Sequence, residues 1–186
     1  MVSVGRRAAL KGAALGTFAF TLGGAQVWLS LREARAQGVD LKILNPAETA
    51  ALEAFGDTLL PGAREAGIAP YVDHQLAAAP EDCLLAARAA NVAPPVAGFY
   101  RAGLAALDQS ARQAFSKSFA ELDPGDRVGH VDQLRLKNPD GWSGPPSPFF
   151  YFCVRNDAVD VVYGTVEGFE RLGVPYMPHI APPRRW

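Results

Sequence analysis

Apolar residues recur at helical spacing along most of the chain, and prolines separate the runs. Asn45 before Pro46 is typical of a helix start, and apolar residues share one face until Pro61-Gly62 ends that helix. The same spacing predicts helices within 68–76, 83–91, 94–107, 115–122 and 123–134. No stretch shows the sustained alternation of a strand. We therefore expect an all-α fold, a small bundle of about five to seven helices.

The C-terminal third begins with a loop rich in proline and glycine over residues 137–148. A helical pattern follows, which starts with consecutive aromatic residues and extends to Tyr163. Successive side chains on a helix point about 100° apart, so these aromatics cannot all face one core. Either this helix is buried on nearly all sides or part of it faces a partner. The residues that we expect at a partner interface are Phe149, Phe150, Phe152, Cys153 and Tyr163.

Residues 173–186 contain too many prolines to form a helix. They are expected to form an extended arm, which is either disordered or laid along another surface. Aromatic residues and Met are enriched at interfaces. The expected anchors of the arm are Tyr176, Met177, Ile180 and Trp186.

The first 36 residues have the pattern of an export signal. Arg6-Arg7, Leu10 and Lys11 precede a weakly apolar stretch over residues 12–31, and Ala34-Arg35-Ala36 is a small-x-small cleavage site. The arginine pair indicates the twin-arginine (Tat) route, although Gly5 and Ala9 depart from its usual pattern. An ordinary signal or a membrane span are the alternatives. We expect a leader over residues 1–36 and one helical domain over residues 37–186.

Charge argues against a nucleic-acid partner. The chain carries 18 Lys and Arg against 19 Asp and Glu, and its leader is basic, so the remainder is acidic. Nucleic-acid binding needs a basic stripe.

Motifs for chemistry are scarce. The sequence has no Cys-x-x-Cys-His, no glycine-rich phosphate loop and no Gly-x-Ser-x-Gly, and its two cysteines are too few for an iron–sulfur cluster. The histidines, His74, His130 and His179, lie far apart. We assign no catalytic, cofactor-binding or metal-ligating residue, and expect a chain that is not itself an enzyme.

Three segments together resemble a known family. They are the Tat-like leader, the run from Leu44-Asn45-Pro46-Ala47-Glu48 through Asp57-Thr58-Leu59-Leu60-Pro61-Gly62, and the late aromatic helix with its Gly/Pro arm. The chain resembles the gluconate 2-dehydrogenase subunit 3 family. Its ending through Leu172-Gly173-Val174-Pro175-Tyr176-Met177 is most similar to small subunits of bacterial FAD-dependent glucose and sorbitol dehydrogenases. Tyr163-Gly164-Thr165-Val166 departs from a Tyr-Gly-Gly-Asn-like stretch of other members, which leaves the substrate open.

The resemblance implies a non-catalytic small subunit. It would bind a large FAD-dependent subunit of the glucose–methanol–choline type, aid its maturation and carry it through the Tat pore to the periplasm. A multihaem cytochrome c subunit would complete the complex at the inner membrane. FAD is expected in the partner, with no cofactor in this chain. The alternatives are a stand-alone periplasmic enzyme or ligand-binding protein, and a membrane tether that retains its signal.

The two cysteines allow two kinds of disulfide in an oxidising compartment. Cys83 and Cys153 could pair within the chain, or Cys153 could form a bridge to the flavoprotein. We favour the intersubunit bridge, since Cys153 lies in the aromatic segment expected to face a partner.

Overall fold

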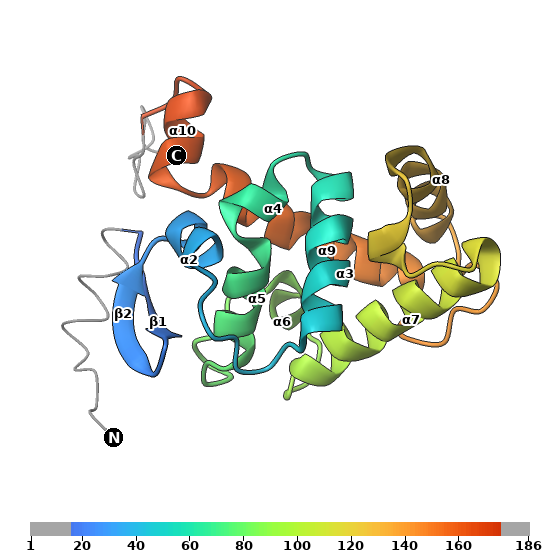
Figure 1. The fold of residues 1–186 in the computed structure, drawn as a ribbon, viewed down its shortest axis with the longest axis horizontal. Coiled ribbons are helices and arrows are strands. Elements are labelled where there is room, and N and C mark those ends of the chain that lie inside the picture. The colour runs from blue at the N-terminus through green and yellow to red at the C-terminus, as the bar shows by residue number, and fades with distance from the viewer. Residues whose placement is uncertain (1–15, 176–186) are drawn as a thin grey trace, which may run out of the picture.

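A computed structural model describes residues 16–175 and shows a mostly helical protein with one small β-hairpin (Figure 1). The expected all-α bundle is confirmed for the body of the molecule. In chain order, the elements are β1 (Phe18–Leu22), β2 (Ala25–Leu29), α2 (Leu31–Gln37), α3 (Pro46–Leu59), α4 (Ala63–Ala66), α5 (Ile68–Leu76), α6 (Ala86–Ala89), α7 (Ala97–Phe115), the 3-10 helix η1 (Phe119–Glu121), α8 (Pro124–Leu134), α9 (Ser147–Tyr163) and α10 (Val166–Arg171).

Helix α9 is the central element, because α3, α4, α5, α6, α7 and α8 all contact it. Its buried positions recur every three or four residues, and they are Ser147, Phe150, Cys153, Val154, Asp157, Ala158, Val161 and Val162. The direction of each position on the helix decides which of the consecutive aromatic side chains are buried and which are exposed. Phe150 is fully buried, Phe149 and Tyr151 pack against the edge of the core, and Phe152 is exposed.

Helix α7 approaches α9 closely at Gly103. A Cβ on Gly103 would lie 2.3 Å from the ring of Phe150, so only glycine leaves room for that ring. On its other side, the Phe150 ring stacks on Phe55 of α3 with the centroids 5.6 Å apart. Phe150 therefore joins α3, α7 and α9 in one aromatic cluster.

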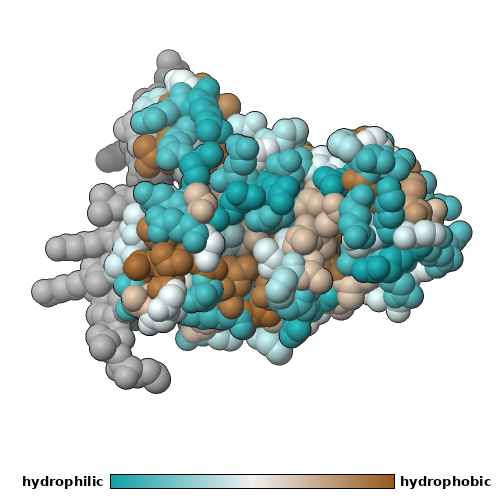
Figure 2. All heavy atoms as spheres, in the orientation of Figure 1, coloured by the Kyte–Doolittle hydropathy of each residue, from teal (hydrophilic) through white to brown (hydrophobic). Residues whose placement is uncertain are grey.

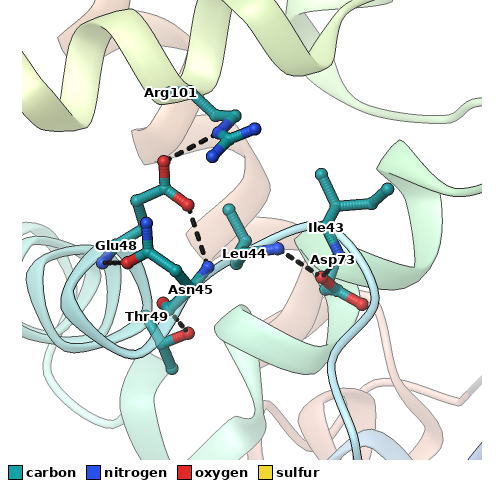
Figure 3. A network of polar contacts seen from close by, with 7 residues as sticks. All are labelled: Ile43, Leu44, Asn45, Glu48, Thr49, Asp73 and Arg101. Carbon is teal, nitrogen blue, oxygen red and sulfur yellow. Dashed lines mark hydrogen bonds and ion pairs between the residues drawn. The ribbon is translucent and has the colours of Figure 1, made fainter.

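The loop before α3 is held by Asp73 of α5. Its carboxylate accepts hydrogen bonds from the backbone N–H groups of Lys42, Ile43 and Leu44, each at 2.8 Å. Figure 3 shows Asp73 beside Ile43 and Leu44. These bonds satisfy backbone donors that the loop itself leaves without partners. Asp73 thereby fixes where the chain enters α3.

The predicted start of α3 is confirmed, and it is connected to α7. Asn45 and Glu48 form a capping box, in which each side chain accepts the other's backbone N–H at 2.9 Å (Figure 3). The second carboxylate oxygen of Glu48 accepts from Arg101 Nε of α7 at 2.8 Å. The capping box that starts α3 therefore also orients this helix against α7.

The N-terminal unit, residues 18–37, comprises β1, β2 and α2. Gly23 and Gly24 both have positive φ and form a two-residue turn that pairs Leu22 with Ala25 and Phe18 with Leu29. This segment was expected to belong to the leader, and the absence of strands was expected for the chain after residue 36. The apolar residues of this segment suit an export leader equally well, so the pattern alone does not reveal a hairpin.

The helix expected over residues 115–122 is also interrupted. Helix α7 continues to Phe115 and ends at Ser116, whose φ of 59° is left-handed. Only the short 3-10 helix η1 follows. Phe119 and Leu122 are nevertheless buried in the core.

The contact at Gly103 predicts a position-dependent effect on stability. Gly103→Ala should reduce the free energy of unfolding by about 1–3 kcal/mol, because the added methyl group collides with Phe150. Gly98→Ala on the same helix is the control. A Cβ there meets nothing within 4 Å, so it should be neutral or stabilise by up to about 1 kcal/mol. Urea unfolding of both variants measures the difference, and equal effects would contradict the packing of α7 on α9.

Candidate partner interface

The expected targeting residues fall in two places. Arg6, Arg7, Leu10 and Lys11 lie outside the described residues. Ala34 and Ala36, the expected cleavage site, lie within α2, where Ala34 is completely buried and Ala36 is exposed. The structure thus places this site inside a packed helix.

The expected interface residues of α9 divide by orientation. Phe150 and Cys153 are completely buried, so they lie in the core and not on a partner-facing surface. Their spacing points them inward with Val154 and Asp157. Phe149 is half-buried, whereas Phe152 and Tyr163 are exposed. The arm residues Tyr176, Met177, Ile180 and Trp186 lie outside the described residues, and their role stays a prediction.

Three exposed apolar residues share one side of α9, and we call this the outer face. Phe152 is 49% exposed, and Val159 and Tyr163 are each 36% exposed. Steps of seven and four residues on a helix return to nearly the same direction, so the three lie in line. The spacing in the sequence shows that these three residues share one side of a helix. Only the orientation of α9 in the structure shows that this side is exposed.

A groove of about 1000 Å³ lies beside the C-terminal half of α9. Its walls are the N-terminal unit on one side and α5, α9 and α10 on the other. Apolar side chains dominate the lining, among them Trp28, Tyr71, Leu84, Val161 and Val166. Trp28, Leu84 and Val166 are among the exposed large apolar residues. Figure 2 shows apolar surface gathered where the hairpin meets α5.

His74 lines the groove at the base of the hairpin. Its ring meets Phe18 and Phe20 edge-on, with centroids 5.2 Å and 5.6 Å away. Burial is the main cause that lowers the pKa of His74, so the ring is uncharged at neutral pH. It therefore acts as an aromatic packing residue.

Buried Asp157 links α9 to α6 and α7. It accepts from the Tyr100 hydroxyl at 2.5 Å and from the Ala86 N–H at 2.9 Å. Burial raises the pKa of Asp157 to about 7, although these two hydrogen bonds oppose the rise. Burial and the neighbouring Asp157 also raise the pKa of Tyr100. Asp157 does not line the groove, so its role is to connect three helices.

His130 is part of a second buried polar contact. Its Nε2 lies 2.9 Å from the hydroxyl of Ser110, and the rings of Phe115 and Phe119 pack against it. Burial lowers the pKa of His130. Both His74 and His130 are thus held by packing, and within residues 16–175 no three His, Cys, Asp or Glu side chains are grouped to hold a metal ion.

The two cysteines are both free thiols. Cys83 is half-buried, whereas Cys153 is completely buried. Burial, followed by the nearby Asp157, raises the pKa of the Cys153 thiol to about 12. Disulfide exchange requires an accessible thiolate, so a bridge from Cys153 to a partner requires α9 to move.

Among the described residues, no helix combines the length and the apolar character that crossing a bilayer requires.

The family model of gluconate 2-dehydrogenase subunit 3 matches residues 46–180. The match spans most of the sequence, and the chain belongs to this family. It is therefore related to subunits of a dehydrogenase complex. Comparisons with curated proteins and with solved structures give no significant match.

The buried carboxyl of Asp157 predicts a pH dependence of stability. Its pKa is about 7 in the folded state against an ordinary value of 3.8, so the folded state holds this proton more tightly than the unfolded state. Stability should therefore fall as pH rises from about 4 to about 7. Asp157→Asn retains the shape without the titration and should lose this component. Urea unfolding across this range measures it, and a constant difference between the two proteins would contradict the assignment.

Proposed function

We propose that this chain is the non-catalytic small subunit of a dehydrogenase complex. It binds a large FAD-dependent subunit of the glucose–methanol–choline type, aids its maturation and carries it through the Tat route. The complex then functions in the periplasm, bound to the inner membrane through a multihaem cytochrome c subunit. Family membership supports a role as a subunit.

The observation that carries the proposal is the outer face of α9, together with the apolar groove at the C-terminal half of that helix. Phe152 and Tyr163 are aromatic and exposed in line on one helix. Aromatic residues are enriched at protein interfaces and depleted on free surfaces, because a partner excludes water from them. The groove at the C-terminal half of α9 is lined mainly by apolar side chains, which suits a protein surface.

The export signal has a direct role in this proposal. A leader with Arg6-Arg7 on the small subunit would direct a folded complex to the Tat pore, so the large subunit needs no signal of its own. This arrangement explains why an export signal precedes a chain whose sequence offers no motif for catalysis.

Replacing the arginine pair tests export. Arg6→Lys with Arg7→Lys should leave both subunits in the cytoplasm, because one signal serves both chains. Arg184→Lys with Arg185→Lys makes the same chemical change in the second arginine pair of the sequence and should not affect export. Immunoblots of periplasmic and cytoplasmic fractions measure the result. A large subunit that still reaches the periplasm with the first variant would contradict the carrier role.

Truncating the outer face tests binding. Phe152→Ala should weaken binding of the large subunit by about tenfold or more, the usual loss for a central aromatic anchor. Leu136→Ala is the control, since Leu136 is an exposed apolar residue after α8 that belongs neither to the outer face nor to the lining of the groove. Affinity measured with the purified large subunit should change only for Phe152→Ala, with unchanged circular dichroism. Equal affinities for both variants would exclude the outer face as the interface.

A further inference from the structure

The N-terminal unit contributes residues from β1 and α2 to the core of the protein. Phe20, Leu31 and Ala34 are 6%, 6% and 0% exposed and belong to the same core cluster as α3 and α5. Cleavage after Ala36 would remove all three. The expected leader therefore includes part of the core.

Helix α2 is complete, with capping at both ends. Ser30 and Glu33 form a capping box at its start, and Gly38 closes its end in the left-handed conformation. Arg35 of α2 contacts Glu53 of α3 at 3.4 Å. The bond after Ala36 lies in the last turn of this helix, whereas proteases prefer exposed, loosely held loops.

The surface beneath α2 is shaped to receive it. Gly67, between α4 and α5, has a φ of 92°, and a Cβ there would lie 2.3 Å from the carbonyl oxygen of Leu31. All three atoms nearest to that Cβ belong to Leu31, so the glycine leaves room for the backbone of α2 in particular.

The hairpin is attached at a second point. The backbone N–H of Asp40 donates to the carbonyl of Thr21 at 2.8 Å. Asp40 precedes the segment that Asp73 holds, so the hairpin is connected to the entry of α3. Phe18 and Phe20 also cover His74. Loss of the unit would expose His74 and the apolar side of α5 to water, a cost that a stable mature subunit has to avoid.

We propose that residues 18–37 are a permanent structural element of the mature subunit, and that any cut of the leader falls before Phe18. This reverses the expectation of cleavage after Ala36. The N-terminal unit then remains one wall of the groove, and Trp28 remains available to a partner. This inference depends on the proposed function in one respect only, which is that the chain is exported.

The first test determines the N-terminus of the exported full-length chain by intact mass and N-terminal sequencing. We expect the mature protein to begin at or before Phe18. A mature chain that begins at Gln37 would overturn the inference. If the chain stays in the cytoplasm, export fails, and the second test decides the inference.

The second test compares two glycines that flank α4 in the full-length chain. Gly62 and Gly67 have φ of 94° and 92°, so alanine pays a similar backbone cost at both. A Cβ on Gly62 meets nothing within 4 Å, whereas one on Gly67 collides with Leu31. Gly67→Ala should therefore lower the Tm by about 3–10 °C more than Gly62→Ala.

Each result has a definite meaning. A Gly67→Ala chain that fails to fold beside a folded Gly62→Ala chain is the extreme form of the expected outcome. Equal losses of Tm would show that α2 does not lie on Gly67, and would overturn the inference whether or not the chain is exported.

Discussion

The burial of one side of α9 against the surrounding helices is the constraint on which the rest of the structure depends. Helices α3 to α8 and α10 contact it, and its aromatic start brings Phe150 against Gly103 and Phe55. A polar residue on the buried side of this helix needs hydrogen-bond partners within the protein. Asp157 therefore takes the Tyr100 hydroxyl and the Ala86 N–H, and these bonds connect α6 and α7 to α9.

The orientation of α9 also decides which of its residues lie in the core and which are available to a partner. Cys153 and Phe150 belong to the core, so they contribute to the stability of the fold and are not exposed to a partner. Phe152 and Tyr163 lie on the outer face, the one side of α9 that other described helices leave uncovered. The reactive and aromatic residues of one short segment thus have different roles, because adjacent positions of a helix point in different directions.

The N-terminal unit changes how the groove is understood. Without β1, β2 and α2, the side of α5 that carries His74 would be open, and the groove would lack one wall. Two separate segments contact this unit. Gly67 lies against Leu31 of α2, and the backbone N–H of Asp40 donates to the carbonyl of Thr21 in β1. A segment that has the composition of an export leader can therefore also be part of a folded domain.

The sequence by itself determined the class of fold and much of the helical framework. Asn45-Pro46 and Pro61-Gly62 marked α3, and Asp123-Pro124 marked the start of α8, because caps and prolines act on their immediate neighbours. Only the tertiary structure decided which aromatic of α9 is buried, that Asp157 bonds to Tyr100, and that residues 18–37 form a hairpin and a docked helix. Residues 18–29 show the difference, since their apolar side chains suit a leader and a hairpin equally. Local signals depend on residues a few positions apart, whereas burial depends on side chains that only the folded chain brings together.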